Sequence, residues 1–378
     1  MLNPTAPSFA LVAGEASGDL LASLLLPGLR ARWPRARAVG IGGPRMREQG
    51  FEAWWPSEKL SVRGYLEVLP RLPELLRIRR QLAARLLADK PDLFIGVDAP
   101  DFNLALEARL RAAADHVLCL FPFEPQLLAA AGIAATYVGH PLARALPFDP
   151  DPGAARRALG LTPDAPTLAI LPGSRAAEIQ YLAPRFFAAA ALLCQRQPEL
   201  QCIVPVLPHL RDAMQAAARG SGLGDALRLV EGQSHTALAA CDVTLIASGT
   251  ATLEAALLGR PMVIAYAMPA LSYRLMRAKR QLPWIGLPNI LCAPRVWLQR
   301  PENMAPHAWA DRPDAPFVVP ELIQHAAQPE ALALAVQDWL AAPEKIAQLK
   351  QRFAALHDEL ARDTAQEAAD ALQTLLAR

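Results

Sequence analysis

Two turns that each join a buried strand to a helix carry the side chains best suited to bind an anion. In the first, residues 243–247 predict an apolar strand, Ser248-Gly249-Thr250 a tight turn, and 251–258 a helix. The helix N-terminus presents free N–H groups, and the hydroxyls of Ser248, Thr250 and Thr252 are close to it in sequence. The pattern favours a phosphate or diphosphate site, although the same hydroxyls could serve only as helix caps.

The second turn, Pro172-Gly173-Ser174-Arg175, follows the predicted strand 167–171 and precedes a helix. Its arginine adds a permanent charge, and the planar guanidinium can bind a phosphate through two hydrogen bonds. Glu254, in the first turn of the helix after Gly249, suits sugar or ribose hydroxyls, or it only complements the helix dipole. Asn289 is a polar residue inside an apolar stretch, which fits either a binding site or a place in the core.

One carboxylate is placed for proton transfer. Asp98 directly follows the apolar run 93–97, which predicts a strand, and α/β proteins bind their ligands at the carboxyl ends of parallel strands. A carboxylate there could deprotonate a substrate hydroxyl; the alternative is a structural aspartate in a turn. Asp101, three residues further on, is explained by helix capping alone.

The sequence indicates neither a metal site nor a redox site. His140 and His209 are isolated, Asp149 and Asp151 lie in a Pro-rich linker, and the five cysteines have no metal-ligand spacing. We therefore expect no metal, no cofactor, and cysteines that stay reduced in the cytoplasm. The net charge of +2 argues against nucleic-acid binding, and neither a signal peptide nor a membrane-spanning run is apparent.

A strand–turn–helix pattern that occurs twice along the 378-residue chain must position these residues. With 53% hydrophobic residues the chain can form two large cores, so we expect an α/β fold of two doubly wound, Rossmann-like domains with a cleft between them. The predicted strands are 8–14, 38–43, 91–98, 115–120, 135–140, 167–171, 202–207, 227–230, 243–247 and, as the last, 261–265. The predicted helices are 20–33 after a turn at 15–19, 102–113, 153–159, 176–197, 210–220 and 251–258, then two more in the tail 330–378.

A further region combines apolar and basic side chains. Trp54 and Trp55 precede the segment 65–80, in which leucines and arginines are interleaved, and Pro70 and Pro73 argue against one regular helix through its first part. Such a surface suits an anionic membrane or acyl chains beside phosphates; the alternative is an amphipathic helix of the core. The apolar members, called the leucine cluster below, are Leu66, Val68, Leu69, Leu72, Leu75 and Leu76.

Six motifs, in one order along the chain, resemble those of the lipid-A-disaccharide synthase family. The resemblance runs from about Phe9 to the C-terminus, and so many motifs in one order are far more specific than any single glycine-rich turn. The motifs are Leu11–Asp19 (LVAGEASGD), Gly43–Met46 (GPRM), Gly96–Asn103 (GVDAPDFN), Leu171–Arg175 (LPGSR), Ala247–Glu254 (ASGTATLE) and Leu287–Asn289 (LPN).

The resemblance implies a GT-B fold and an inverting glycosyltransferase that needs no metal and is peripheral to the cytoplasmic face of the inner membrane. The implied reaction joins UDP-2,3-diacylglucosamine to 2,3-diacylglucosamine 1-phosphate through a β-1,6 linkage and releases UDP. The expected domains are 1–150, which takes the acceptor and faces the membrane, 166–350, which binds the UDP-sugar, and a C-terminal helix over 351–378 that crosses back to the first domain. A homodimer is left open.

By the same resemblance, Asp98 corresponds to the general base on the acceptor 6-hydroxyl, and Glu15 and Ser17 line the first domain's side of the cleft. Arg211 falls near a basic residue needed for activity, and the leucine cluster corresponds to the family's membrane and acyl-chain surface. The residues that correspond to the UDP side are Gly173, Ser174, Arg175, Ser248, Gly249, Thr250, Glu254 and Asn289.

The chain departs from the family pattern in two places. After Ala114 it continues directly with Asp115, where the family normally inserts a strand, a Ser-Pro-Ser-Val-Trp-Ala-Trp-Arg segment and a basic helix. The second departure is a Pro- and Trp-rich insertion, Trp297–Phe317, expected to be a surface loop. Two other hypotheses therefore stay open: a catalytically inactive, truncated paralogue that retains UDP-sugar or lipid binding, and another GT-B enzyme that uses UDP-N-acetylglucosamine, such as an epimerase.

Overall fold

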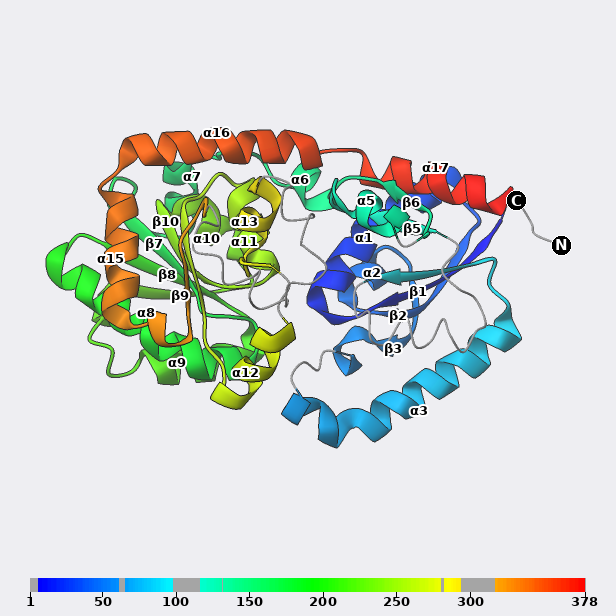
Figure 1. The fold of residues 1–378 in the computed structure, drawn as a ribbon, viewed down its shortest axis with the longest axis horizontal. Coiled ribbons are helices and arrows are strands. Elements are labelled where there is room, and N and C mark those ends of the chain that lie inside the picture. The colour runs from blue at the N-terminus through cyan, green and yellow to red at the C-terminus, as the bar shows by residue number, and fades with distance from the viewer. Residues whose placement is uncertain are drawn as a thin grey trace. The chain divides into compact units, whose positions relative to one another are not determined.

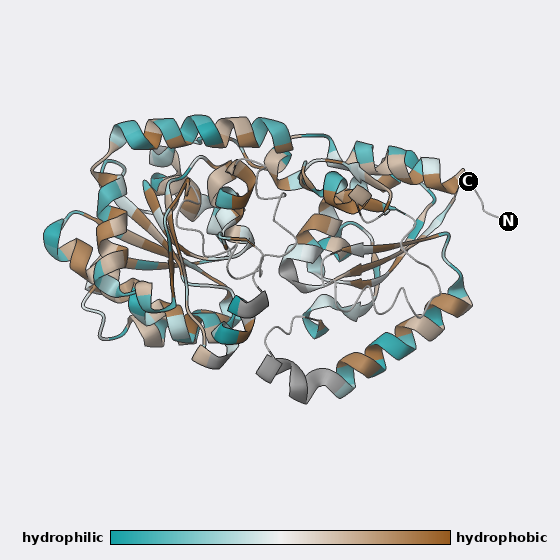
Figure 2. Ribbon diagram, in the orientation of Figure 1, coloured by the Kyte–Doolittle hydropathy of each residue, from teal (hydrophilic) through white to brown (hydrophobic). Residues whose placement is uncertain are grey.

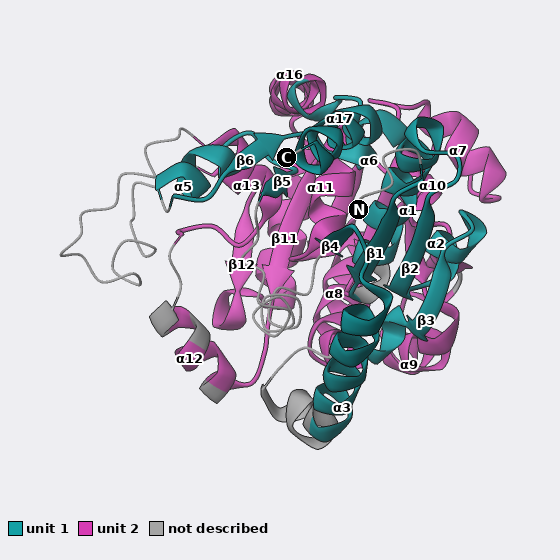
Figure 3. Cartoon of the chain, turned by 90° about the vertical axis from the view of Figure 1, so that its right-hand side faces the viewer, with its two compact units in different colours: residues 1–145, 359–378 teal, residues 146–358 magenta. Residues whose placement is uncertain are grey.

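The computed structural model (Figure 1) describes residues 6–60, 65–97, 116–130, 132–279, 282–293 and 317–377. Its strands are largely hydrophobic (Figure 2), as parallel sheets covered on both faces require. The chain divides into two compact units (Figure 3): unit 1 comprises Met1–Ala145 and Glu359–Arg378, and unit 2 comprises Leu146–Asp358. Among the described residues, no helix is both long and apolar enough to cross a membrane.

Unit 1 contains a parallel sheet of four strands in the order β3-β2-β1-β4. The central strand β1 is paired on both sides, with Leu11 opposite Gly40 of β2 and Ile95 of β4. A separate two-stranded parallel sheet is formed by β5 and β6. The strands are β1 (Ser8–Ala13), β2 (Arg37–Gly42), β3 (Glu52–Pro56), β4 (Leu93–Val97), β5 (Val117–Cys119) and β6 (Ala135–Tyr137).

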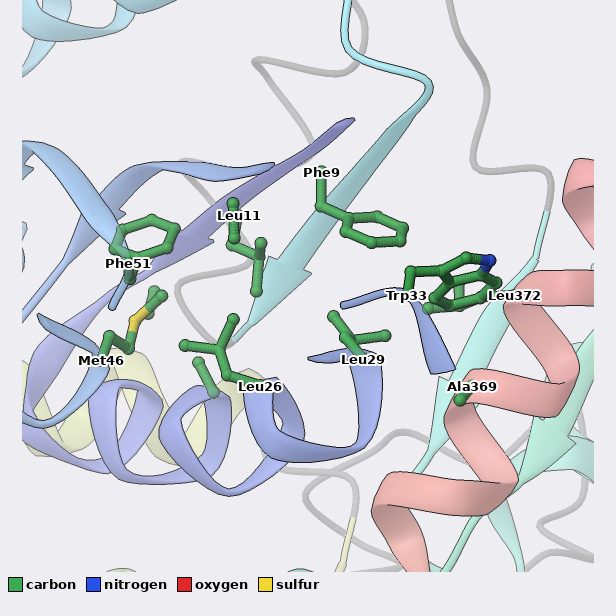
Figure 4. Packing of buried hydrophobic residues seen from close by; sticks show 12 residues of the cluster. Phe9, Leu11, Leu26, Leu29, Trp33, Met46, Phe51, Ala369 and Leu372 are labelled. Carbon is green, nitrogen blue, oxygen red and sulfur yellow. The ribbon is translucent and has the colours of Figure 1, made fainter. Parts of the chain in front are cut away.

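Alternate side chains of β1 enter two separate cores, because successive residues of a strand point to opposite faces of the sheet. Phe9 and Leu11 belong to the core formed with helix α1 (Glu15–Arg32). Ala10 and Val12 belong to the core formed with helix α3 (Tyr65–Asp89). The buried helical residues include Leu26 and Leu29 in the first core (Figure 4), and Ile78, Leu82 and Leu86 in the second.

The C-terminal helix α17 (Thr364–Leu376) completes the first core. Its Ala369 and Leu372 are buried in the same cluster as Trp33 (Figure 4). The close approach of α17 to α1 depends on Gly28, because a Cβ there would lie 2.6 Å from the Cβ of Ala365. The last helix therefore belongs to unit 1, although the preceding helix α16 (Pro343–Leu360) lies almost wholly in unit 2. The shorter described helices of unit 1 are α2 (Pro44–Glu48), α5 (Glu124–Ala130) and α6 (Pro141–Ala145).

Unit 2 contains a six-stranded parallel sheet in the order β12-β11-β10-β7-β8-β9. The chain runs from β7 outward to β9, then returns to β10 and runs outward in the other direction, so the sheet is doubly wound with its topological switch point between β7 and β10. The strands are β7 (Thr167–Leu171), β8 (Gln201–Val206), β9 (Leu227–Glu231), β10 (Val243–Ala247), β11 (Met262–Tyr266) and β12 (Glu321–Ile323). The helices are α7 (Pro152–Ala158), α8 (Ala176–Arg196), α9 (Arg211–Ala218), α10 (Ser234–Ala240), α11 (Thr250–Leu257), α12 (Ala270–Lys279), α13 (Leu287–Cys292) and α15 (Pro329–Leu340).

Several elements of unit 1 differ from the sequence prediction, which gave no helix at the places of α2, α5 and α6. Helix α1 begins at Glu15, inside the stretch predicted as a turn; the buried Asp19 side chain accepts the N–H groups of Gly43 and Met46 and so anchors the start of this helix. Strand β3 was not expected. The predicted break at Pro70 and Pro73 is wrong, since α3 continues through both; the lost backbone hydrogen bonds are offset by the buried apolar stripe further along the helix.

The end of the chain also differs. Strand β12 follows the strand predicted to be the last, and the tail contains three helices rather than two. Pro343 begins α16, and Asp363 caps α17 by accepting the N–H of Gln366 at 3.2 Å, which divides the tail at points that its Ala-rich composition conceals. The predicted helix 102–113 lies outside the described residues.

Candidate functional site

The two anion-binding turns predicted from the sequence leave the sheet of unit 2 at neighbouring strands. β7 and β10 are paired, with Leu171 opposite Ile246, so the turns that follow them emerge side by side at the carboxyl edge of the sheet. This edge is also the topological switch point, where doubly wound sheets bind ligands because the helices on its two sides diverge. The structure therefore brings Gly173–Arg175 and Ser248–Thr250 together.

The first turn is built around Glu178, which the sequence reasoning missed. The N–H of Ser174 donates to Oε2 of Glu178 at 2.9 Å, and Nη1 of Arg175 lies 2.7 Å from Oε1. Gly173 has φ +132°, and a Cβ there would lie 2.4 Å from both Cβ and Oε2 of Glu178. Glycine is required at this position both by its backbone angle and by the approach of the glutamate.

The second turn is open on the side of its glycine. Gly249 has extended backbone angles and is exposed, and a Cβ added to it would meet no atom within 4 Å. The hydroxyl of Ser248 donates to the carbonyl of Ile285 at 2.7 Å. The buried hydroxyl of Thr252 donates to the carbonyl of Gly249 at 2.7 Å, so it stabilises the helix start and does not face a ligand. Thr250, the first residue of α11, is partly exposed beside Gly249.

Glu254 lies in the second turn of α11, one turn beyond the predicted position. Its side chain is 15% exposed, and its Oε2 lies 3.1 Å from Nε2 of His235, at the start of α10. The imidazole holds one carboxylate oxygen and thereby fixes the orientation of the other. No feature of the sequence pattern pointed to His235.

Asn289 is a structural residue of this region. It is fully buried, and its Nδ2 donates to the carbonyl of Val319 at 2.9 Å and to Oε1 of Glu321 at 2.7 Å, while its Oδ1 accepts the N–H groups of Val318 and Val319. Both amide protons and both lone pairs are therefore used within the protein. The side chain therefore keeps no hydrogen-bonding group for UDP, and the place of Asn289 on the UDP side stays a prediction.

The Asn289 network nevertheless reaches the second turn. Glu321 also accepts the N–H groups of Ile285 and Gly286, at 2.8 and 2.9 Å. The carbonyl of Ile285 in turn accepts the hydroxyl of Ser248. Asn289 and Glu321 thus position the loop against which Ser248 is held.

Arg211 lies at the same edge of the unit 2 sheet, beyond β8. It begins α9, and its Nη1 lies 2.9 Å from Oε1 of Glu231, the last residue of β9. Both side chains are close to half exposed, so the ion pair contributes little stability and leaves the guanidinium accessible.

In unit 1, the start of α1 and the end of β4 occupy the corresponding place. β1 and β4 are paired, with Ala13 opposite Val97, and the N–H of Gly14 donates to the carbonyl of Val97 at 3.3 Å. Ser17 is partly exposed in the first turn of α1, whereas nothing is described for the side chain of Glu15. Asp98, which directly follows Val97 in the chain, lies outside the described residues.

The leucine cluster is described only at its end. Leu75 and Leu76 are partly buried, and Leu75 packs against the core beneath α3; the side chains of the other members, Leu66, Val68, Leu69 and Leu72, lie outside the described residues. Further along α3, Leu87 is 58% exposed. The second half of this helix is thus an amphipathic core helix with one large apolar side chain, that of Leu87, on its outer face.

No group of three or more His, Cys, Asp or Glu side chains within the described ranges could hold a metal ion. All five cysteines are free. His140 of unit 1 is buried, which lowers its pKa to about 4, so its imidazole is neutral at physiological pH. Its Nδ1 accepts the N–H of Leu142 at 3.3 Å, which leaves the proton on Nε2.

Two solved structures share this architecture over nearly the whole chain. The Anabaena HepE protein, in complex with UDP and glucose, matches 97% of this chain and 99% of its own, with a TM-score of 0.54 and 14% identity. A UDP-GlcNAc 2-epimerase from Neisseria meningitidis, bound to UDP-GlcNAc, matches 98% and 100%, with a TM-score of 0.59 and 10% identity. At such identities the likeness is one of fold, and together with the sheet topology it defines the class: an α/β protein of the GT-B fold with two Rossmann-like units.

The sequence comparisons identify the family. A family model described as lipid-A-disaccharide synthetase matches residues 9–114 and 109–299. The lipid-A-disaccharide synthase of Verminephrobacter eiseniae is 55% identical over 399 residues, which cover 97% of each chain, and that of Albidiferax ferrireducens is 54% identical over 398 residues with the same coverage. This chain belongs to the lipid-A-disaccharide synthase family, as its motifs predict.

The match to the family is interrupted at one point. The two stretches that fit the family model meet at residues 109–114. The alignment with the Verminephrobacter eiseniae relative spans 399 positions, more than the 378 residues of this chain, so that relative carries residues without a counterpart here. Both observations agree with a family segment missing after Ala114.

Proposed function

We propose that this chain joins UDP-2,3-diacylglucosamine to 2,3-diacylglucosamine 1-phosphate through a β-1,6 linkage, forming lipid A disaccharide 1-phosphate and UDP. The observation that carries the proposal is the pair of turns at the switch point of unit 2, in a chain of the lipid-A-disaccharide synthase family. The epimerase alternative is not favoured, because the high-identity relatives are lipid-A-disaccharide synthases.

Unit 2 is the proposed donor-binding unit. The diphosphate of the UDP-sugar would lie against the turns, taking hydrogen bonds from the N–H of Ser174, from Thr250 and from the guanidinium of Arg175. The open side of Gly249 lets a phosphate approach the backbone. Glu254, with one oxygen held by His235, would accept ribose hydroxyls through the other, and Arg211 would add positive charge at the same edge.

Unit 1 is the proposed acceptor-binding unit. Asp98 would take the proton of the acceptor 6-hydroxyl as this oxygen forms a bond to the anomeric carbon of the donor sugar. The bond from that carbon to the phosphate oxygen breaks, and the electron pair leaves with UDP, whose added charge the turns of unit 2 stabilise. Glu15 and Ser17, beside the strand end that Asp98 follows, would orient the acceptor.

Both substrates carry acyl chains, which requires access to a lipid surface. The leucine cluster and the arginines of α3 would provide it on the cytoplasmic face of the inner membrane, combining apolar insertion with attraction to anionic headgroups. Leu87, exposed on the same helix, supports this proposal. A homodimer is compatible with it.

A second candidate function is UDP-sugar or lipid binding without catalysis. The interruption of the family match at residues 109–114 favours it, because the missing residues belong to unit 1, which supplies the proposed base. The donor turns lie in unit 2 and have a continuous match to the family model up to residue 299.

One assay separates the two. Purified protein is incubated with both diacylated substrates, and the disaccharide 1-phosphate is followed by mass spectrometry, with Asp98→Ala as the control. The proposal predicts product with the natural sequence and a loss of at least about a hundredfold in the variant. UDP binding without product would support the second function, and full activity of the variant would remove Asp98 from its role.

A further inference from the structure

The carboxylate of Glu178 lies on the groups of the first turn that are proposed to bind the diphosphate. One of its oxygens accepts the N–H of Ser174 at 2.9 Å, and the other lies 2.7 Å from Nη1 of Arg175. The side chain of Glu178 is 11% exposed and that of Arg175 is 31% exposed. The two oxygens of one carboxylate therefore contact two of the groups that are proposed to bind the diphosphate.

A helix cap is the simplest alternative explanation. Glu178 is the third residue of α8, where a glutamate commonly reaches back to the N–H of the cap residue. Here the cap residue is Arg175, yet the carboxylate extends past its backbone to the N–H of Ser174 and pairs with the arginine side chain. The carboxylate thus contacts Ser174, one residue before the cap, as well as the side chain of the cap residue itself.

The turn is shaped to admit this carboxylate. Gly173 leaves room for it, because any Cβ at that position would lie 2.4 Å from Oε2 of Glu178. The guanidinium of Arg175 lies at the N-terminus of α8, where the helix dipole disfavours positive charge. The carboxylate neutralises both the guanidinium and the helix end.

We propose that Glu178 is an intramolecular placeholder for phosphate: it occupies the anion site of the first turn in the free protein and is displaced when the diphosphate of a nucleotide binds. This inference rests on the proposed function of the same turn. Displacement preserves the pairing of Arg175, which exchanges one anion for another. The competing carboxylate also raises the apparent Kd of UDP, which equals the intrinsic Kd divided by the fraction of molecules whose site is free of it. Weaker binding in turn favours release of the product.

The test compares UDP binding by the full chain and by Glu178→Gln, measured by isothermal titration calorimetry. Glutamine keeps the size of the side chain and an oxygen for the N–H of Ser174, but it carries no charge to compete for Arg175. We expect the Kd of UDP to fall about three- to tenfold in this variant. The matched control is Glu199→Gln, which makes the same change in net charge at an exposed site just beyond the far end of α8.

Inorganic diphosphate serves as a second probe, and its Kd is expected to fall by the same factor, because the competition concerns the phosphates alone. Weaker or unchanged binding of UDP by Glu178→Gln, with the control unchanged, would overturn the placeholder and leave Glu178 as a helix cap. A natural chain that binds neither UDP nor diphosphate would instead remove the proposed donor site itself. The two failures are therefore distinguishable.

A second variant covers loss of folding. If Glu178→Gln lowers the melting temperature of the protein, Glu178→Asp is used instead. Aspartate retains the charge, but its side chain is one methylene shorter and cannot reach both the N–H of Ser174 and the guanidinium of Arg175. The placeholder predicts tighter UDP binding for this variant too, whereas a cap or a direct ligand of the nucleotide predicts weaker binding. In a chain that also carries Arg175→Ala, the gain in UDP affinity from Glu178→Gln should shrink towards zero. An undiminished gain in that double variant would contradict competition between Glu178 and the nucleotide for the guanidinium.

Discussion

Gly249 offers a substitution that separates ligand binding from folding. Its backbone is extended, with φ 163°, an angle open to any residue, and a Cβ there meets no atom within 4 Å. It is also the cap residue of α11, a position at which threonine and glycine are about equally favoured. Gly249→Thr should therefore change the free energy of unfolding by less than about 0.5 kcal/mol.

The same substitution should impair nucleotide binding. Threonine adds three heavy atoms to the open side of the turn, where we propose that a phosphate contacts the backbone. We expect the Kd of UDP to rise at least about tenfold, or about 1.4 kcal/mol. Urea unfolding gives the first quantity and calorimetric titration with UDP the second. Unaltered UDP affinity in a stable variant would refute the placement of the ligand at this turn.

Gly173 should behave in the opposite way, which makes Gly173→Ala a useful contrast. Its φ of +132° is strained for alanine, and the new Cβ would collide with Glu178. We expect a loss of about 1–3 kcal/mol in the free energy of unfolding, together with weaker UDP binding. Equal free energies of unfolding for Gly249→Thr and Gly173→Ala would contradict the difference between an open turn at Gly249 and a crowded turn at Gly173.

Substitutions at three further positions test the surroundings of the site and the stability of unit 1. Asn289→Ala removes four hydrogen bonds and leaves buried polar groups of the 318–321 segment without partners. It should therefore lower the free energy of unfolding by about 3–5 kcal/mol, measured by urea unfolding of unit 2. A loss under about 1 kcal/mol would contradict the structural role of Asn289. His235→Ala should raise the KM for the UDP-sugar roughly two- to tenfold, while the KM for the acceptor stays constant. His235→Gln should bring the KM for the UDP-sugar part of the way back. Equal effects on the KM of both substrates would argue that His235 does not position Glu254. Burial lowers the pKa of His140 from its ordinary value of 6.5 to about 4, so the free energy of unfolding is unaffected above pH 6.5 and falls towards pH 4 by up to about 3 kcal/mol. His140→Asn should flatten this part of the pH–stability curve, and an unchanged curve would assign the acid sensitivity to other groups.

The strands around the switch point were predictable because buried parallel strands are short apolar runs between turns. Strand 243–247 was predicted with the bounds that the structure gives it. Strand β12 was missed because it has only three residues and is held through Asn289 and Glu321, contacts that span about thirty positions of sequence.

Side-chain directions at the site were less predictable. The sequence could not show that the hydroxyl of Thr252 turns inward or that Asn289 uses all its hydrogen bonds within the protein, because both depend on backbone groups brought together by folding. Glu178 had a local signal, since it is the third residue of a helix that follows a glycine turn. His235 had none, because its partner lies on another helix, 19 residues away.

The location of the nucleotide at the switch point of unit 2 is the central claim, and hydrogen–deuterium exchange with and without saturating UDP tests it most directly. The account predicts slower exchange of the amides in 173–178 and 249–254 together, because both turns are proposed to donate N–H groups to one diphosphate. Slower exchange confined to unit 1, or protection of one turn without the other, would contradict it.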